Sequence, residues 1–337
     1  MNIDVRTSWE IPTLEVTDIG GNGRSQADCD KRLVLVEKVV EIGIKNRWTK
    51  REVAKRSGVA EGSFSQWFSA KYKGRFDEIN QKVDNWIVGL TGAMAIKKAI
   101  PKSPKFIETK IAVEIWGTFT AAQNLPAMTL ITADAGAGKT ATSREYKLRN
   151  ANVYIVVISP HTKTVHSMLL STAEAVGVKH ANPARLVSDI GKRLKSENAP
   201  TLLIVDEAQN LVDDAINQLR HFTDEYGCGI ALLGNNESYT RFAAWGKSAQ
   251  YGQLHRRIFK RVSQKKPNKS DIEMFIRAWG IEEPEMVRFL TGVGMKPGAL
   301  GQIDMTIKLA MLKAVGEGKE LTLEALQKAW KNRDVEG

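Results

Sequence analysis

The sequence predicts an α/β fold in which a parallel β-sheet is preceded and followed by helical domains. Helical periodicity alone is found before residue 91 and after residue 265, so the sheet is expected between these positions. In that middle part a glycine-rich loop follows an apolar segment of strand length, as in proteins that bind a ligand at the strand ends of a parallel sheet. The apolar segments predicted to be strands are 127–132, 153–158, 201–205 and 229–234.

The chain is expected to begin with a tail and a helical domain. Residues 1–28 contain Gly-Gly-Asn-Gly-Arg-Ser and show little periodicity, which predicts a flexible tail. Residues 29–90 are predicted to form a helix-turn-helix DNA-binding domain. Its first helix begins near Lys31. The residues expected to share the apolar face of that helix are Leu33, Val36, Val39, Val40 and Ile44.

A capping box and a glycine define the next helices of this domain. Thr49 and Glu52 have the spacing of a capping box, and Gly58 is expected to end the helix that they start. A second helix follows the turn, and a third spans about 77–90. A plain helical hairpin is the alternative, but the glycine turn and the basic surroundings favour DNA binding. The residues expected to face DNA here are Ser63, Gln66 and Lys71.

Basic residues are concentrated in the first third of the chain. The formal net charge is +11, and the segment from Asp30 to Lys105 contains 17 Lys and Arg against 8 Asp and Glu. This excess favours a polyanionic partner, double-stranded DNA, over a merely solvated basic surface. No apolar run reaches about 18 residues, so no membrane association is expected. Cys29 and Cys228 have no metal-type spacing, which is typical of a reduced, cytoplasmic protein.

Residues 91–106 are predicted to be a basic linker stiffened by Pro101 and Pro104. The α/β nucleotide-binding domain is expected at 107–265. A helical domain, called the lid below, is expected at 266–337, and a capping box beginning at Ser270 opens it.

The loop after the first predicted strand has the composition of a phosphate-binding loop. Its glycines let the backbone turn its N–H groups toward a triphosphate. Lys139 can reach the β- and γ-phosphates, and the Thr140 hydroxyl can bind Mg²⁺. Ala133 stands where the strict pattern has glycine, and we interpret it as a tolerated variant. The residues predicted to bind the nucleotide are Ala135, Gly136, Ala137, Gly138, Lys139, Thr140 and Ala141.

Two acidic residues follow the third predicted strand. Asp206 is expected to bind Mg²⁺ together with Thr140, and Glu207 is expected to orient or deprotonate the attacking water. Solvated acids at a strand end are common, but their order after a phosphate-binding loop favours a catalytic site. Asn235 follows the next strand and is a candidate to contact the γ-phosphate or the water, although asparagine alone is more typical of a turn.

Together these features resemble the P-loop AAA+ ATPases, and more narrowly the MuB family of transposition activators of Mu-like phages. The resemblance covers about residues 31–332. The segments that match the family are Tyr72–Gly74, Gly136–Tyr146, Asp206–Ala208, Leu232–Asn235 and Lys296–Leu300.

The resemblance implies an ATPase that binds duplex DNA largely without sequence preference when ATP and Mg²⁺ are bound. It also implies a homo-oligomer, a helical filament on DNA, which presents the target to a transposase that stimulates hydrolysis. The setting would be the cytoplasm of a bacterial host cell. In such an assembly the loop holding Lys163 should line the DNA-facing surface, and Lys192 and Arg193 are further candidates. A solvated basic surface is the alternative for these three residues.

The resemblance further implies an arginine supplied to the site by a neighbouring subunit. Arg257 fits that role best, with a DNA-facing or solvated arginine as the alternative. One departure concerns the lid, where many AAA+ proteins have an arginine and this chain has Gly301; Lys308 is a candidate to replace it.

Two other functions are compatible with the same motifs. A DNA-binding regulator could use ATP only as an occupancy switch, but Glu207 argues for hydrolysis. A replicative helicase loader shares the ATPase core, but the helix-turn-helix and the Lys296–Leu300 segment favour transposition.

Overall fold

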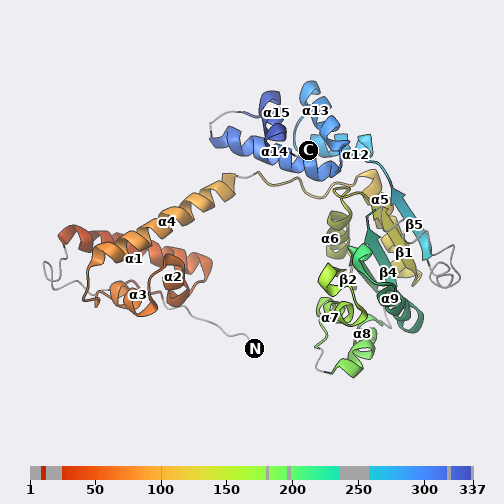
Figure 1. The fold of residues 1–337 in the computed structure, drawn as a ribbon, viewed down its shortest axis with the longest axis horizontal. Helices are drawn as coiled ribbons and strands as arrows, with labels where there is room; N and C mark the ends of the chain where they lie inside the picture. The colour runs from red at the N-terminus through yellow and green to blue at the C-terminus, as the bar shows by residue number, and fades with distance from the viewer. Residues whose placement is uncertain are drawn as a thin grey trace. The chain divides into compact units, whose positions relative to one another are not determined.

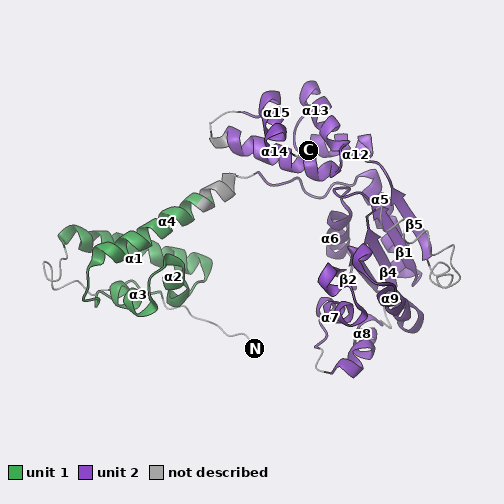
Figure 2. Cartoon of the chain, in the orientation of Figure 1, with its two compact units in different colours: residues 1–100 green, residues 101–337 purple. Residues whose placement is uncertain are grey.

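A computed structural model describes two compact units of the chain, residues 1–100 and residues 101–337 (Figure 2). Each unit has its own hydrophobic core or cores, so each is considered by itself. The residues that the structure describes are 9–12, 25–99, 101–179, 182–195, 199–235, 258–316 and 320–334.

The described part of the first unit is helical (Figure 1). The predicted capping box forms, because Thr49 Oγ1 accepts a hydrogen bond from Glu52 N, and Glu52 Oε2 accepts one from Thr49 N. Gly58 ends the helix in the left-handed region with φ 70°, and Val59 then turns into the core. The helices are α1 (Gln26–Asn46), α2 (Lys50–Ser57), α3 (Glu61–Phe68) and α4 (Phe76–Ala99).

The predicted tail at 1–28 is wrong where the structure describes it. The helix α1 begins at Gln26, and Trp9 is buried in the core of the unit. Trp9 Nε1 donates a hydrogen bond of 2.8 Å to the Trp48 carbonyl oxygen. Gly43 makes room for the ring, since a Cβ there would lie 2.3 Å from it. One aromatic side chain therefore anchors a segment whose composition gives no periodic signal.

Two further predictions for this unit need correction. Leu33 and Ile44, which we expected on the apolar face of α1, are about half exposed, and Leu35 is buried instead. The helix α4 continues to Ala99, so residues 91–99 of the predicted linker are helical. This segment is rich in helix-forming residues, and the first helix-breaking residue is Pro101.

The second unit is built on a five-stranded sheet with the order β2-β3-β4-β1-β5, in which all pairs are parallel (Figure 1). The strands β1 to β4 coincide with the four predicted strands to within a residue at each end. The strands are β1 (Met128–Ala133), β2 (Val153–Val157), β3 (Leu202–Asp206), β4 (Gly229–Gly234) and β5 (Ile258–Gln264).

The strand β5 was not predicted, and its position explains why. It forms an edge of the sheet, where only Val262 is buried and Phe259 is 56% exposed. An edge strand need not be apolar on both faces, so its sequence lacks the continuous apolar run by which the inner strands were found.

Helices cover both faces of the sheet in a three-layer arrangement. In β3, Leu202 and Ile204 pack with residues of α5 and α6, whereas Leu203 and Val205 pack with residues of α7, α8 and α9. The inner strands β1, β3 and β4 are therefore buried at every position and largely apolar. These helices are α5 (Lys110–Asn124), α6 (Lys139–Arg149), α7 (Val165–Val176), α8 (Leu186–Leu194) and α9 (Asp213–Tyr226), with short 3₁₀ turns η2 (Pro160–Thr162), η3 (Pro183–Arg185) and η4 (Ala208–Asn210).

The lid consists of four helices with a core of their own. Residues 266–337 were predicted to be a helical domain, but Asn268 rather than Ser270 caps its first helix. The helices are α12 (Lys269–Ala278), α13 (Pro284–Gly294), α14 (Ala299–Gly316) and α15 (Leu323–Asn332).

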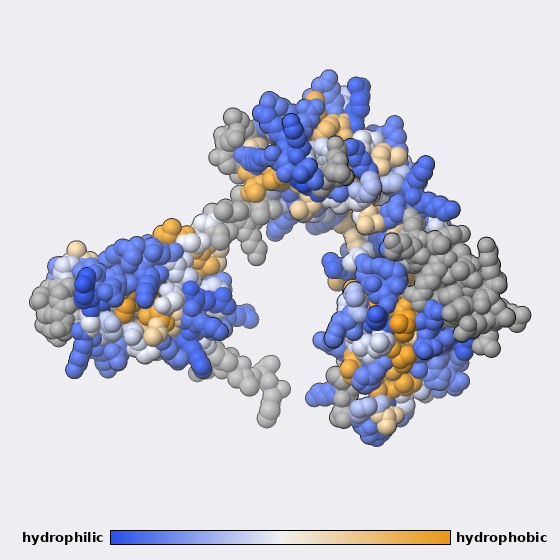
Figure 3. Space-filling model, in the orientation of Figure 1, coloured by the Kyte–Doolittle hydropathy of each residue, from blue (hydrophilic) through white to orange (hydrophobic). Residues whose placement is uncertain are grey.

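Hydrophilic residues cover most of the face of the first unit that Figure 3 shows, whereas apolar residues gather over part of the second unit. Among the helices of the described residues, none combines the length and the apolar character that a membrane crossing requires.

Candidate nucleotide-binding site

The ends of three adjacent strands define the site. The strand β4 lies between β1 and β3. The last residues of these strands, Ala133, Asp206 and Gly234, therefore lie next to one another at the C-terminal ends of the strands. The register pairs Thr132 of β1 with Gly234 of β4. Because parallel strands end at the same edge, the loop after β1, the acids after β3 and Asn235 after β4 are brought to one place.

Residues 134–138, the phosphate-binding loop, connect β1 to α6. Gly136 and Gly138 have φ values of 81° and 91°, a region that favours glycine. Lys139 begins α6, and its Nζ donates hydrogen bonds to the carbonyl oxygens of Ala133 (2.5 Å) and Asp134 (3.1 Å). Ala133 is a buried residue in strand conformation, where alanine can replace glycine without backbone strain.

Two opposing influences act on the pKa of Lys139. Burial is the largest influence and lowers the pKa of the Lys139 ammonium, while the carboxylates of Asp206, Glu207 and Asp134 act to raise it. The net direction is downward. A triphosphate would add negative charge beside this ammonium and favour its charged form.

Oxygen atoms from two elements meet next to the loop. Thr140 Oγ1 donates a hydrogen bond of 2.7 Å to Asp206 Oδ2, and the Asp206 side chain is buried. The other oxygen, Asp206 Oδ1, accepts a hydrogen bond from Glu207 N at 2.9 Å. A hydroxyl and a carboxylate are hard oxygen donors of the kind that Mg²⁺ prefers, so this pair fits the ion.

Glu207 lies directly after β3 in the left-handed region, with φ 57°. Its side chain is exposed toward the cleft, and its carboxylate accepts a hydrogen bond from Gln209 Nε2. The positive φ turns the chain sharply at the strand end. Glu207 therefore projects away from the sheet while Asp206 stays buried within it.

A cleft of about 570 Å³ runs from the phosphate-binding loop to the lid. Thr140 and Glu207 are among the residues that line it. Apolar side chains from three separate segments also line it, and such side chains suit the flat face of a nucleotide base. These apolar residues are Ile107, Ala112, Phe275 and Leu300.

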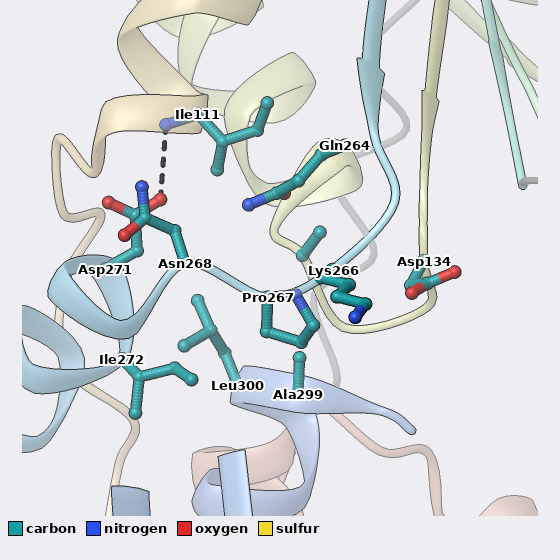
Figure 4. A pocket seen from close by; sticks show the side chains of 11 residues that line it. Ile111, Asp134, Gln264, Lys266, Pro267, Asn268, Asp271, Ile272, Ala299 and Leu300 are labelled. Carbon is teal, nitrogen blue, oxygen red and sulfur yellow. Dashed lines mark hydrogen bonds between the residues drawn. The ribbon is translucent and has the colours of Figure 1, made fainter. Parts of the chain in front are cut away.

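The lid is attached to the α/β part of the unit beside this cleft. Asp271 of α12 is buried, and its two carboxylate oxygens accept hydrogen bonds from Lys110 N (2.8 Å) and Ile111 N (3.3 Å) at the start of α5. A carboxylate stabilises the first N–H groups of a helix. Figure 4 shows the hydrogen bond between Ile111 and Asp271 at a small cavity of about 20 Å³, which Pro267, Ala299 and Asp134 of the loop also line.

The residues predicted to bind DNA are distributed over both units. Gln66 and Lys71 are exposed and Ser63 is half-buried in the first unit. Lys163 is exposed between η2 and α7, and Lys192 is exposed on α8.

Two predicted arginines have different outcomes. The Arg193 guanidinium lies 5.7 Å from the centre of the Tyr154 ring, and its Nε donates to the Val176 carbonyl oxygen at 3.2 Å, so part of this side chain already has partners within the protein. Arg257 lies outside the described residues.

The candidate for the missing lid arginine has other partners. Lys308 Nζ donates hydrogen bonds to Asp304 Oδ2 (2.7 Å) and to Ser103 Oγ (2.6 Å). It is not among the residues that line the cleft, whereas Gly301 is.

Sequence reasoning missed several residues of the site. Phe275 and Ile107 are distant along the chain from the phosphate-binding loop, and no spacing rule connects them to it. Asp271 was interpreted only as part of a local capping box at the start of α12, but it caps α5 instead. The pairing of Gln209 with Glu207 could have been suspected only from their proximity in sequence.

Comparisons with known proteins give consistent results. A family model described as an AAA domain matches residues 123–242, and a model described as Mu B transposition protein, C terminal, matches residues 256–332. The chain is 26% identical over 288 residues to the ATP-dependent target DNA activator B of Escherichia phage Mu, which covers 86% of this chain and 91% of the relative.

A second relative is the Mu-like prophage FluMu DNA transposition protein B of Haemophilus influenzae. It is 30% identical over 262 residues, which cover 75% of this chain and 88% of the relative.

Among solved structures, the ORC2 protein of Aeropyrum pernix, determined as ADPNP and ADP complexes, superimposes with a TM-score of 0.56 at 14% identity. The match covers 71% of this chain and 72% of that chain. At this identity the likeness concerns the fold alone, and it agrees with the parallel sheet and phosphate-binding loop of a P-loop AAA+ protein.

Proposed function

The chain belongs to the MuB family of phage transposition proteins, and from this premise we propose that it holds target DNA for a transposase in an ATP-dependent manner. It is an ATPase with an AAA+ domain. The observation that supports the proposal most is the contact of Thr140 with Asp206, with Glu207 next in the chain, at the edge of the sheet. Such a site both binds and hydrolyses a nucleoside triphosphate.

Binding of ATP begins with the phosphate-binding loop. The main-chain N–H groups of the loop and the start of α6 attract the phosphates. Lys139 then exchanges the carbonyl oxygens of Ala133 and Asp134 for phosphate oxygens. Thr140 and Asp206 are the residues that would hold Mg²⁺, whose chemical contribution is to neutralise phosphate charge.

Hydrolysis requires a positioned water molecule. Glu207 has the right place in the chain for the general base, because it follows Asp206 and faces the cleft. Its carboxylate must exchange the Gln209 amide for that water. Asn235 follows the adjacent strand and is our candidate for contacting the γ-phosphate, and Arg257 of a neighbouring subunit is our candidate for neutralising charge in the transition state.

DNA binding is proposed for two regions. The first is the exposed connection around Lys163, together with Lys192 on α8. A filament that follows the phosphate backbone needs charge contacts without base specificity, which lysines on exposed segments supply. The second is the helix-turn-helix that we assign to α2 and α3 in the first unit, with Ser63, Gln66 and Lys71 toward the DNA.

Hydrogen bonds between the region around Lys163 and the segment next to Glu207 support the first of these proposals. The Lys163 carbonyl oxygen accepts a hydrogen bond of 3.1 Å from Val212 N, and Asn210 Nδ2 donates one of 3.0 Å to the Ile158 carbonyl oxygen. The segment 208–212 therefore links the connection around Lys163 to the residues next to Glu207. Displacement of that connection by DNA can change the position of Glu207.

We further propose that the protein assembles head to tail into a helical filament on duplex DNA and that the transposase stimulates hydrolysis. Electron microscopy of the purified protein with duplex DNA tests the first part. Filaments that form with ATP and not without it are the expected result. ATP-dependent DNA binding without filaments would favour a regulator that uses ATP as an occupancy switch, whereas equal DNA binding in both conditions would contradict ATP-dependent DNA binding altogether.

A further inference from the structure

The lid touches the phosphate-binding loop through two glycines. Gly136 in the loop and Gly298 just before α14 both have positive φ, 81° and 93°. A Cβ built on Gly136 would lie 1.9 Å from the Gly298 carbonyl oxygen and 3.2 Å from Gly301 N. Side chains cannot come this close to a backbone, so the contact requires glycine at position 136. The lid backbone therefore lies directly against the loop that binds phosphates.

At this point the lid offers backbone and no side chain. Gly301 lines the cleft, and a Cβ there would be 3.9 Å from the Gly136 Cα, which is ordinary van der Waals distance. Position 301 is thus well placed to direct a side chain at the nucleotide, but glycine has none. The closest approach of the lid to Gly136 therefore comes from the main chain of residues 298–301.

A network of hydrogen bonds holds that main chain in place. Gln302 N donates to the Gly298 carbonyl oxygen at 3.2 Å, and Gln302 Nε2 donates to the Pro297 carbonyl oxygen at 3.1 Å. Arg333, which follows α15, donates to Gln302 Oε1 (2.5 Å), to the Gln302 carbonyl oxygen (2.9 Å) and to Thr306 Oγ1 (2.8 Å). A rigid guanidinium with several donors can fix a neighbouring amide in one orientation.

The indole of Trp330 reinforces the same arrangement. Lys296 Nζ lies 5.4 Å from the centre of this ring, and the Arg333 guanidinium lies 5.6 Å from it. Two cations near one aromatic ring connect the residue that starts the turn with the residue that holds Gln302. The turn is thus supported from α14 and from the end of α15.

We propose that the turn Lys296–Gly298 is the part of the lid that keeps the phosphate-binding loop in its nucleotide-binding conformation, and that Gln302 and Arg333 are positioning residues for this turn. The proposal rests on the ATP-dependent function proposed above. It implies that nucleotide affinity depends on the lid through a backbone contact at Gly136. Any movement of the lid relative to the sheet then changes nucleotide affinity, and nucleotide binding changes the lid in return.

The first test compares two glycine substitutions in the lid. In Gly298→Ala the new Cβ would lie 2.8 Å from the Gln302 side chain, and the positive φ disfavours alanine. In Gly280→Ala the φ of 75° is similarly unfavourable, but no atom lies within 4 Å of the new Cβ. The second variant therefore reproduces the backbone strain without disturbing the turn.

Binding of a fluorescent, non-hydrolysable ATP analogue to the full-length protein without DNA is the measurement. We expect Gly298→Ala to weaken binding about fivefold or more, the lower end of typical coupling between sites, and Gly280→Ala to bind like the wild type. In steady-state hydrolysis, KM should rise with little change in kcat, because Thr140, Asp206 and Glu207 are untouched. Thermal melting of both variants shows how much strain each adds.

The second test uses Arg333, with Arg288 on α13 as an exposed control in the lid. Arg333→Ala should weaken binding of the same analogue, and Arg288→Ala should not. If both residues act through the turn, the double variant Gly298→Ala with Arg333→Ala should bind no more weakly than the weaker single variant. The comparison of Arg333→Ala with Arg288→Ala remains informative if Gly298→Ala does not fold.

Wild-type affinity in Gly298→Ala and in Arg333→Ala, with normal binding by the unaltered protein, would overturn the inference and leave the proposed function intact. Affinity losses in Gly280→Ala equal to those in Gly298→Ala would also overturn it, since strain alone would then explain them. Absence of ATP-dependent filaments in a protein that shows the expected differences would instead count against the proposed function.

Discussion

At the scale of single residues, the proposed catalytic roles are based on where each side chain lies relative to a strand end. Asp206 is the last residue of β3 and stays buried against Thr140, whereas Glu207 is turned out of the sheet by its positive φ. Adjacent acids in one sequence motif thus have different environments. The buried one suits a metal ligand, and the exposed one suits a base that must reach water.

Glu207→Gln should therefore separate binding from hydrolysis. The amide keeps the size of the carboxylate but cannot accept a proton, so we expect kcat for ATP hydrolysis to fall about 10²- to 10⁴-fold. ATP-dependent DNA binding should persist or become tighter, because ATP stays bound longer. Asp224→Asn, an exposed acid on α9 far from the strand ends in sequence, serves as a control. Normal turnover in Glu207→Gln would reject the assignment.

At the scale of elements, side chains outside the helices also contribute to the cores that hold the helices together. Trp9 fills space beside Gly43 of α1, contacts the ring of Phe68 edge-on with centroids 5.7 Å apart, and bonds to the Trp48 carbonyl oxygen. The segment around Trp9 is thus part of the core of the first unit.

Trp9→Ala should destabilise the first unit by about 3 kcal/mol, the usual cost of truncating a buried aromatic side chain. Ile11→Ala, in the same segment but at a residue 55% exposed, should have little effect. Hydrogen exchange of α1 amides in the full-length protein measures the local free energy of opening. Equal exchange in the two variants would mean that Trp9 does not stabilise this core.

The connection between β2 and α7 is the second element whose role can be tested. Lys163 is exposed there, and its carbonyl oxygen is held by Val212 N. Because the bond uses the main chain, Lys163→Ala should leave the fold unchanged. We expect DNA affinity to fall for all sequences and the salt dependence of log K to become less steep by about one unit. Lys179→Ala, at an exposed lysine after α7, is the control; an equal loss there would point to net charge alone.

At the scale of the whole molecule, the nucleotide site belongs to one unit, and the proposed assembly would complete it between subunits. The second unit contains the nucleotide site and the lid, and residues 103–107 and Thr109 before α5 also line the cleft. A head-to-tail assembly would complete each site with a residue of the next subunit. Arg257, which lies outside the described residues, is the candidate.

Mixing two inactive variants tests that arrangement. Glu207→Gln retains Arg257, and Arg257→Ala retains Glu207, so in equal mixtures roughly one head-to-tail interface in four has both residues intact. We expect the ATPase activity of the mixture to rise toward about one quarter of the wild-type activity. Glu207→Gln mixed with Lys139→Ala should show no recovery, because both changes damage the same half of the site. Failure of the first mixture, with co-assembly demonstrated, would exclude Arg257 acting between subunits.

The sequence by itself determined the parts of this protein that depend on local pattern. Apolar runs located the three inner strands and the edge strand β2, because strands covered on both faces are largely apolar. The glycines and Lys139-Thr140 identified the phosphate-binding loop, and the acids after β3 followed from their position at a strand end. The helical character of the lid followed from its periodicity.

Only the tertiary structure decided what depends on neighbours far apart in the sequence. The strand β5 has little apolar signal because Val262 is the only one of its residues that is buried. Burial of Trp9 depends on space left by Gly43, and the close approach of Gly298 to Gly136 depends on how the lid packs. Such contacts join residues with no common period or spacing. Their free energy comes from packing and hydrogen bonds between elements, and a linear pattern does not record these.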